Sequence, residues 1–398
     1  MKILITADCY TPTINGVVTS ILNLETELRR LGHDVKILCP SENFHSSESE
    51  NVYRIGSVGV GRIYSGARAA LRISQSHLQK LIDWKPDIIH SQSEFSSFIM
   101  AKRIAAEVNC PIVHTYHTVY ENYTHYFSPS ITLGRKAVIL MTKRILRHTK
   151  AVIAPSQKIE RLLKDYGIAQ PIKVIPTGLR LKKFSDDISV NIINELKAKL
   201  GIPLKSRVLI TVGRAAKEKN IDELIRYFKR LDIENTVFVI VGGGPYRDAL
   251  KDLAYAENIS DKMIFTGAVE PENIAAYYRL GDIFLSASQS ETQGLTYIEA
   301  LASGLPAVCR RDDCLNDVIT NGKNGGQYTD FKEFSELIRT FLFNDELYKS
   351  MSEKAVQTAQ KYSAEKFAKD VETVYMEILE KRNHYEITNT FYNCENCS

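Results

Sequence analysis

The chain has 398 residues, of which 44% are hydrophobic and 25% charged, and this composition excludes collagen-like, disordered and disulfide-stapled proteins. The net charge of +4 is small, but residues 1–180 carry 23 Lys and Arg against 14 Asp and Glu (+9), which leaves 28 against 33 (−5) for residues 181–398. The asymmetry predicts that the first half of the chain faces something anionic.

The first half alternates short β-branched runs with helix-period stretches, the pattern of a parallel sheet with crossover helices. Lys2–Thr6 is predicted as a strand, and Val17–Leu31 as a helix that ends at Gly32. Further strands are predicted at Val35–Cys39, Asp87–His90, Ile112–Thr115, Ala151–Ala154 and Lys173–Ile175.

The second half repeats this pattern. A helix is predicted at Ile221–Leu231, Pro176–Pro203 is interpreted as a linker, and Phe331–Lys381 is helical throughout. Strands are predicted at Val208–Val212, Val237–Val241, Met263–Thr266, Ile283–Ser286 and Ala307–Cys309. The predicted fold class is α/β, with two doubly wound Rossmann-like domains that face each other across a cleft. We expect domains at 1–180 and 181–374, and a C-terminal helix and tail at 375–398 that returns to the first domain.

Targeting signals and cysteines bear on the compartment. No apolar run approaches the roughly 20 residues of a membrane-spanning helix, and Asp8 interrupts the first apolar stretch too early for a signal peptide. Seven cysteines without a paired framework favour a reducing compartment. Cys394-x-x-Cys397 lacks the second pair of a zinc site, and we interpret it as having no function. We therefore expect a cytoplasmic protein.

The most informative motif spans residues 290–306, directly after the predicted strand Ile283–Ser286. Gly294 is predicted to begin a helix there. The backbone N–H groups at its start, those of Gly294, Leu295 and Thr296, would bind an anion.

Two carboxylates accompany this motif. Glu291 precedes the helix and Glu299 lies within it, so they can contact different ends of one ligand. Two surface charges would be the simpler interpretation. The strand, the glycine and the helix in register with the pair favour a binding site.

Two further loops follow strands of the second half. Gly213–Asn220 presents Arg214 and Lys219, and two cations at a strand's carboxyl end suit a diphosphate; a solvated loop is the alternative. Gly243 lies in a run of three glycines after Val237–Val241, where a ligand could approach the backbone closely or the chain could simply turn.

Two segments of the first half follow strands in the same way. Gly16 and Val17 begin the first helix, and their amides would lie near a phosphate. His117 follows Ile112–Thr115, at the edge where doubly wound sheets bind ligands. A structural role for this histidine is the alternative.

These motifs resemble family 4 of the retaining glycosyltransferases, which have the two-domain GT-B fold. Glu-x7-Glu (Glu291, Glu299) and Gly-Arg-x-x-x-Glu-Lys-Asn (Gly213–Asn220) carry the resemblance, which covers nearly the whole chain. It implies an acceptor-facing and membrane-facing first domain and a second domain that binds a nucleotide sugar.

The resemblance also implies roles for the motif residues. Arg214 and Lys219 would hold the diphosphate, with Gly16 and Val17 closing on it from the other domain. Glu299 would bind the ribose. The donor sugar and its phosphate would contact Glu291, Gly243 and the amides of Gly294, Leu295 and Thr296. Val269 would face the uracil, and His117 would lie over the reacting face of the sugar. The family needs no metal or other cofactor.

Within this family the chain is most similar to bacterial 1,2-diacylglycerol 3-alpha-glucosyltransferases. The similar stretches are Asn15–Ser20, Tyr64–Arg68 and Tyr116–Tyr126. Related enzymes that act on polyprenyl-linked, cell-wall or polysaccharide acceptors share these features.

A basic segment independently favours a lipid acceptor. Residues 122–159 contain seven Lys and Arg and no acidic residue. If residues 135–150 form a helix, four of its basic side chains fall within about 60° of one another, opposite Val138, Met141 and Ile145. These four are Lys136, Lys143, Arg147 and Lys150. Such a helix would dock on anionic lipid; a helix packed on the core, with a solvated basic face, is the alternative.

We therefore expect a retaining hexosyltransferase that moves glucose from UDP-glucose to diacylglycerol, peripherally attached to the inner face of the cell membrane. Nucleic acid is not an expected partner. A GT-B enzyme with another acceptor is the first alternative, and a non-catalytic nucleotide-sugar-binding protein is the second.

Overall fold

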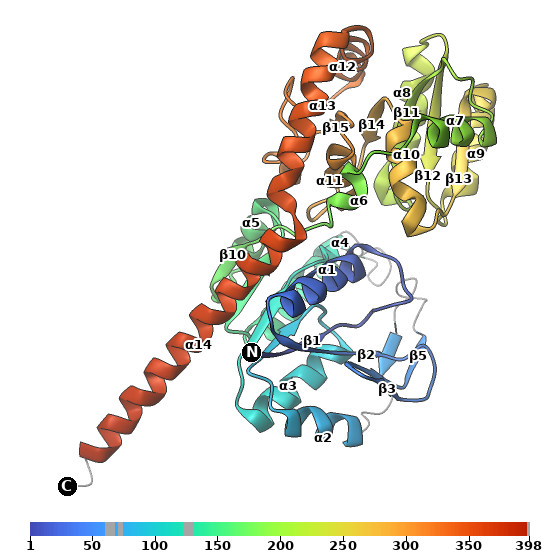
Figure 1. The fold of residues 1–398 in the computed structure, drawn as a ribbon. Helices are drawn as coiled ribbons and strands as arrows, with labels where there is room; N and C mark the ends of the chain where they lie inside the picture. Colours follow the sequence, from blue (N-terminus) through green and yellow to red (C-terminus); the bar gives the residue numbers. More distant parts are fainter. Residues whose placement is uncertain (60–67, 71–74, 122–129, 396–398) are drawn as a thin grey trace. The chain divides into compact units, whose positions relative to one another are not determined.

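The computed structural model of the chain describes residues 1–59, 68–70, 75–121 and 130–395. The chain divides into two compact units, which are Met1–Gly178 together with Ala364–Ser398, and Leu179–Ser363. Figure 1 labels most of their helices and many of their strands. The chain leaves the second unit beside the point where it enters it, since Leu179 N–H donates to the Tyr362 carbonyl at 2.9 Å.

The first unit is built on an eight-stranded sheet in the order β10-β9-β8-β7-β1-β2-β4-β3, parallel except for β3. The predicted strands of the first half are confirmed within one or two residues. The strands are β1 (Lys2–Thr6), β2 (Asp34–Pro40), β3 (Ser47–Ser49), β4 (Val52–Ile55), β7 (Ile88–Ser91), β8 (Ile112–Thr115), β9 (Ala151–Ala154) and β10 (Ile172–Val174). A separate antiparallel pair joins β5 (Ser57–Gly59) to β6 (Arg68–Ala70).

Helices cover both faces of this sheet. Successive side chains of β1 point to opposite faces of the sheet and therefore show which helices cover which face. Ile3 and Ile5 pack in one buried cluster with α1 and α14, while Leu4 packs in another with α2 and α3. A third cluster joins α4 and α5 to β9. The helices are α1 (Gly16–Arg30), α2 (Gln75–Trp84), α3 (Ser96–Val108), α4 (Ile131–Leu146), α5 (Gln157–Asp165) and α14 (Ala364–Glu395).

The second unit has a six-stranded, all-parallel sheet in the order β13-β12-β11-β14-β15-β16. Its strands are β11 (Arg207–Val212), β12 (Thr236–Val241), β13 (Met263–Gly267), β14 (Ile283–Ser286), β15 (Ala307–Arg310) and β16 (Gly325–Tyr328). Its helices are α6 (Lys182–Ser185), α7 (Val190–Lys199), α8 (Ile221–Leu231), α9 (Arg247–Ala256), α10 (Ile274–Leu280), α11 (Leu295–Ala302), α12 (Phe331–Phe343) and α13 (Asp345–Ala359). Two doubly wound α/β domains are therefore confirmed.

The strand β16 has no apolar pattern and was not predicted. Its first two residues are glycines that lie against neighbouring elements. A Cβ on Gly325 would be 2.2 Å from the Ala307 carbonyl oxygen of β15, and one on Gly326 would be 2.5 Å from Leu337 of α12. Close packing therefore selects glycine here in place of the β-branched residues that usually mark a strand.

The helix α14 belongs to the first unit from its first turn, whereas the predicted boundary was residue 374. Phe367, Val371 and Tyr375 are buried against β1 and α1, and the Tyr375 hydroxyl lies 2.6 Å from His90 Nδ1 on β7. The chain therefore returns eleven residues earlier than expected, at Ser363/Ala364.

Phe367→Ala should lower the free energy of unfolding by about 3–5 kcal/mol, the usual cost of truncating a buried Phe, because Phe367 is 3% exposed. Met376→Ala, on the same helix but 47% exposed, is the matched control and should cost far less. Urea unfolding measures both. Equal losses would show that α14 is not docked as described.

Candidate active site

The sheet of the second unit reverses its strand order between β11 and β14. The chain runs from β11 through β12 to β13 on one side, and from β14 through β15 to β16 on the other. Loops that leave two such strands diverge, and this is where parallel α/β sheets bind ligands. The predicted motifs follow these two strands, Gly213–Asn220 after β11 and residues 290–296 after β14.

An ion pair joins the two loops at this point. Lys219 Nζ lies 2.5 Å from Glu291 Oε1, with the two side chains 28% and 17% exposed. The side-chain amide of Asn220 also donates to the Ala287 carbonyl at 3.2 Å, and the Ser290 hydroxyl donates to the Glu218 carbonyl at 3.3 Å. The structure thus brings together two residues for which the sequence predicted separate contacts, one with the diphosphate and one with the sugar.

Gly294 begins the helix α11 as predicted. It has φ +80°, and a Cβ there would lie 2.2 Å from the Tyr297 ring. The first hydrogen bond of this turn runs from Tyr297 N–H to the Gly294 carbonyl, so the amides of Leu295 and Thr296 have no partner within the helix. They point toward the helix N-terminus, where negative charge is stabilised.

The carboxylate of Glu299 is held by a residue that the sequence analysis missed. The Tyr278 hydroxyl, on α10, donates to Glu299 Oε2 at 2.7 Å. Burial raises the pKa of Glu299 despite this bond and the nearby charge of Lys183. No sequence signal marks Tyr278, because its distance from Glu299 depends on how α10 packs on α11.

The glycine run after β12 has a structural role. Gly242 and Gly244 have positive φ, and Cβ atoms on them would lie 1.9 and 2.3 Å from the carbonyl oxygens of Gly213 and Ala215. These two glycines let the loop after β12 pack on the loop after β11. Gly243 has room for a Cβ, 3.6 Å from Ala268.

The predicted residues of the second unit therefore lie along one edge of its sheet. Val269 follows β13, Gly243 follows β12, Arg214 and Lys219 follow β11, and the Glu291 loop follows β14. These four strands are consecutive neighbours.

The first unit reverses its strand order in the same way, between β1 and β7. Gly16 and Val17 begin α1 in the segment that follows β1, where the Asn15 side chain already accepts from Val18 N–H at 2.9 Å. His117 follows β8, and its Nε2 lies 2.6 Å from Gln92 Oε1, beyond the end of β7. Burial lowers the pKa of His117 to about 3, with a smaller contribution from His114, so its ring is neutral at physiological pH.

Two acidic residues at this reversal were not predicted as site residues. Asp8 follows β1 and accepts from Phe95 N–H at 2.9 Å and Ser97 N–H at 2.8 Å. Glu94 follows β7 and is 8% exposed. The rule that selected His117, a polar residue just past a strand's carboxyl end, applies equally to both.

Two family models together span most of the chain. The family described as "Glycosyltransferase Family 4" matches residues 14–183, and "Glycosyl transferases group 1" matches residues 192–358. The alpha-monoglucosyldiacylglycerol synthase of Streptococcus pneumoniae is 36% identical over 389 residues, which cover 96% of this chain and 87% of that protein. The protein of the same name from Acholeplasma laidlawii is 33% identical over 393 residues, which cover 96% and 98%.

The chain belongs to glycosyltransferase family 4. It is therefore an enzyme, and the non-catalytic alternative is not supported.

Solved structures confirm the GT-B fold of this glycosyltransferase. Anabaena HepE, in complex with UDP and glucose, has a TM-score of 0.75 at 16% identity and covers 95% of this chain and 100% of its own. Sucrose-phosphate synthase from Thermosynechococcus elongatus has a TM-score of 0.76 at 18% identity, with coverages of 96% and 100%. At such low identity these likenesses establish the fold alone.

The predicted basic helix of the glycosyltransferase is α4, and its bounds differ from those expected. It begins at Ile131 with Ser130 as N-cap and ends at Leu146, with Arg147 as C-cap. The Thr149 hydroxyl donates to the Leu146 carbonyl at 2.7 Å and turns the chain toward β9. Lys150 was expected on the helix but lies after this turn. Lys136 and Lys143 are exposed on α4, as is Arg144, and Arg147 is exposed at its C-cap.

Parts of two stretches on which the resemblance rests, residues 64–67 and 122–126, lie outside the described residues, as does Cys397 of the C-terminal cysteine pair. Within the ranges that the structure does describe, none of the helices combines the length and apolar character needed to span a bilayer. In the same ranges no three His, Cys, Asp or Glu side chains are grouped so that they could hold a metal ion.

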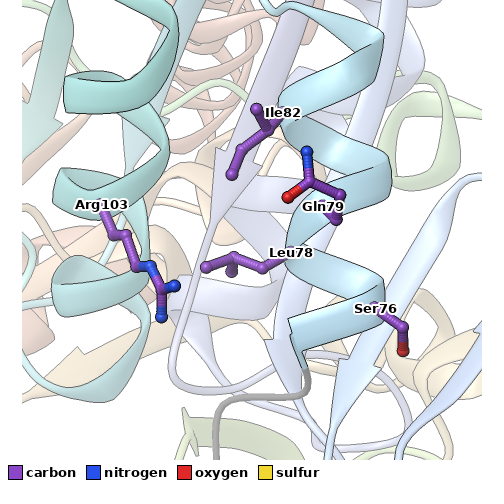
Figure 2. A pocket seen from close by; sticks show the side chains of 5 residues that line it. All are labelled: Ser76, Leu78, Gln79, Ile82 and Arg103. Atoms are coloured by element: carbon purple, nitrogen blue, oxygen red, sulfur yellow. The ribbon is translucent and has the colours of Figure 1, made fainter.

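A surface hollow of about 280 Å³ lies between α2 and α3 (Figure 2), on a helix-covered side of the first sheet. Its lining contains one charged group, Arg103, beside Ser76, Leu78, Gln79 and Ile82. None of the predicted site residues is among them.

The titration of Asp8 should be visible in the stability of the glycosyltransferase. Burial raises the pKa of Asp8 from 3.8 to about 6, and the charge of Glu94 adds to the rise. Between these pH values the folded chain keeps a proton that the unfolded chain releases. Stability from Asp8 is therefore fully present below about pH 3.8 and is lost as the pH rises through about 6.

Asp8→Asn removes this titration. The free energy of unfolding of the parent, minus that of the variant, should fall by on the order of 3 kcal/mol between pH 4 and pH 7. Urea unfolding at a series of pH values measures the difference. A difference that stays constant across this range would show that Asp8 does not titrate there.

Proposed function

We propose that this glycosyltransferase transfers glucose from UDP-glucose to the free hydroxyl of diacylglycerol with retention of configuration, forming an α-monoglucosyl lipid. The observation that carries the proposal is the similarity, over 96% of the chain, to two proteins named alpha-monoglucosyldiacylglycerol synthase. The residues of the second unit suit the donor, and the surface of the first unit suits a lipid acceptor.

The donor would lie along the carboxyl edge of β13, β12, β11 and β14. Val269 would face the uracil, and Glu299, oriented by Tyr278, would bind the ribose hydroxyls. Arg214 and Lys219 would hold the diphosphate, with Glu291 and the α11 amides at the sugar and its phosphate. Gly16 and Val17 at the start of α1 would add backbone amides to the phosphate contacts.

The reaction breaks the bond between the glucose C1 and the β-phosphate oxygen, and its electron pair stays on the phosphate. The acceptor oxygen bonds C1 on the same face, and its proton passes to the released diphosphate. Charge therefore develops on the diphosphate, where two cations and helix amides stabilise it. This mechanism draws on these protein groups and on no metal ion.

His117 would contact the sugar as a neutral imidazole. Its Nε2–H faces Gln92 Oε1, which leaves Nδ1 as the hydrogen-bond acceptor of the ring. Because its pKa is about 3, it does not serve as a positively charged acid near neutral pH.

A screen of donors against acceptors tests the proposal. Radiolabelled UDP-glucose, UDP-galactose, UDP-N-acetylglucosamine and GDP-mannose are each offered with dioleoylglycerol vesicles, polyprenyl phosphate and a soluble polysaccharide. We expect α-glucosyl diacylglycerol from UDP-glucose. Preferred transfer to either of the other acceptors would overturn the lipid assignment and support the alternative acceptor class.

Arg214→Ala and Lys219→Ala should each reduce kcat/KM by an amount equal to about 2–4 kcal/mol of transition-state stabilisation, the size of a lost charge-stabilising donor. Lys217→Ala, an exposed lysine in the same loop, is the matched control and should stay near the parent. Steady-state kinetics with UDP-glucose measures all three. A loss below threefold would remove either cation from the diphosphate site.

We also propose that α4 docks this enzyme on the inner, anionic leaflet of the cell membrane. Leu133 and Leu140 are 65% and 70% exposed, and at 100° per residue the helix places Leu133 and four basic residues within about 60° of Leu140. These basic residues are Lys136, Lys143, Arg144 and Arg147. Val138 and Leu146 are buried on the opposite side. Exposed leucines among basic side chains are typical of interfacial helices.

The neighbouring helix α3 adds charge to this surface. Burial lowers the pKa of His148, and the charges of Lys102, Arg147 and Arg144 lower it further. Lys102 lies on α3, so two helices contribute to one positive region.

Changing Lys136, Lys143, Arg144 and Arg147 to glutamine should remove about 1 kcal/mol of attraction per residue. Sedimentation with vesicles of phosphatidylglycerol should then fall to the level seen with phosphatidylcholine. The control variant changes four exposed lysines of the second unit, Lys199, Lys205, Lys229 and Lys251, and alters the net charge equally. If both variants bind phosphatidylglycerol vesicles equally well, α4 does not dock on the membrane and its basic side chains are only solvated.

A further inference from the structure

A hydrogen bond between a buried glutamate and a partly buried tyrosine lies at the strand-order reversal of the first unit. The Tyr120 hydroxyl, just beyond β8, donates to Glu94 Oε2 at 2.5 Å. The other carboxylate oxygen of Glu94 lies 3.2 Å from His114 Nε2. Glu94 is 8% exposed and His114 fully buried. The pair thus lies at the same sheet edge as His117.

This arrangement of carboxylates lowers the stability of the fold. Asp8 lies close enough for the two carboxylates to repel each other. In the described part of the chain, the hydrogen bonds recorded for the Glu94 side chain come from a tyrosine and a histidine and not from Lys or Arg. Buried carboxylates without strong cationic partners lower stability, and such clusters concentrate at functional sites.

The hydroxyl of Tyr120 has a restricted role because its one proton is committed to Glu94. Burial raises the pKa of Tyr120, and the charge of Glu94 adds to this, so the phenol stays neutral. A neutral phenol oxygen that has donated its proton can only accept further hydrogen bonds. It is therefore suited to a molecule that offers an O–H, such as an alcohol.

Exposed apolar side chains lie close to the Tyr120 ring. Phe95 is 50% exposed, and its ring centroid is 5.7 Å from that of Tyr120 in an edge-to-face arrangement. Ile99 N–H donates to the Phe95 carbonyl, so Ile99 lies one helical turn further along α3, and it is 62% exposed. A tyrosine hydroxyl whose ring contacts an exposed phenylalanine, with an exposed isoleucine one helical turn away, suits an alcohol on an apolar body better than a sugar.

We propose that Tyr120 and Glu94 form the acceptor-hydroxyl site of this enzyme, with Phe95 and Ile99 as its apolar rim. The inference rests on the proposed function and names where the lipid alcohol binds. Tyr120 accepts the hydrogen bond of the alcohol, and Glu94 is a positioning residue that holds the Tyr120 hydroxyl. The alcohol oxygen keeps its lone pairs available for the glucose C1. As it bonds C1, its O–H turns from Tyr120 to the leaving diphosphate, which takes the proton.

Tyr120→Phe tests the site by removing one oxygen while keeping the ring. We expect the KM for diacylglycerol to rise at least tenfold, while the KM for UDP-glucose and the slow hydrolysis of the donor by water stay within twofold. Tyr166→Phe is the matched control, because it also removes one tyrosine oxygen, but the Tyr166 hydroxyl donates to Glu121 Oε1 at 2.7 Å and not to Glu94. Its acceptor KM should match the parent. Equal values for both variants would overturn the assignment.

The positioning role of Glu94 is tested by comparing two substitutions, of which only one keeps a hydrogen-bond acceptor for Tyr120. Glu94→Gln keeps an oxygen that can accept from Tyr120, whereas Glu94→Leu does not, so only the second should raise the acceptor KM as Tyr120→Phe does. Thermal unfolding identifies a Leu variant that fails to fold, and the Gln variant together with Tyr120→Phe then decides. A Gln variant with the acceptor KM of Tyr120→Phe would exclude the positioning role.

The rim is tested with Phe95→Ser/Ile99→Ser in detergent micelles, where vesicle docking does not contribute. The double variant should lose at least tenfold in kcat/KM for diacylglycerol and retain the parent's donor hydrolysis. An unchanged kcat/KM would refute the assignment of Phe95 and Ile99 to the acceptor site.

The two proposals fail separately. A parent enzyme that glucosylates no diacylglycerol refutes the proposed function. A parent that does so, with Tyr120→Phe equal to Tyr166→Phe, refutes only the acceptor site.

Discussion

Parallel strands place all of their carboxyl ends on one edge of a sheet, and most features of this enzyme follow from that constraint. Each unit reverses its strand order once, between β1 and β7 in the first and between β11 and β14 in the second. The loops at each reversal begin side by side, and polar residues far apart in the chain therefore meet there. Lys219 and Glu291, 72 residues apart, are the clearest example.

The two reversals carry different chemistry. In the second unit, cations and helix amides converge where an anion can be held, with a partly buried glutamate, Glu299, positioned by Tyr278. In the first unit, two carboxylates and a neutral histidine gather instead, with exposed apolar side chains beside them. The diphosphate of the proposed donor and the hydroxyl of the proposed lipid acceptor would each use one of these two regions.

Close packing sets a second constraint on the site. Gly242, Gly244 and Gly294 each occupy a position where a Cβ would lie within about 2.3 Å of a neighbouring atom. These glycines bring the loops after β11 and β12 together and begin α11. Their backbone conformations hold Arg214, Lys219 and the α11 amides in place, so they act on the site through the loops that they shape.

The sequence by itself determined the fold class, the strands with β-branched runs and the motifs at their ends, because these signals are local. Only the tertiary structure showed β16, the early return of α14 and the end of α4 before Lys150, since close packing and a side-chain cap decide them. The same holds for the Lys219–Glu291 pair, for Tyr278 on Glu299 and for the Tyr120–Glu94 pair. Each joins residues from different elements, and their distances depend on strand order and helix packing, which no local pattern encodes.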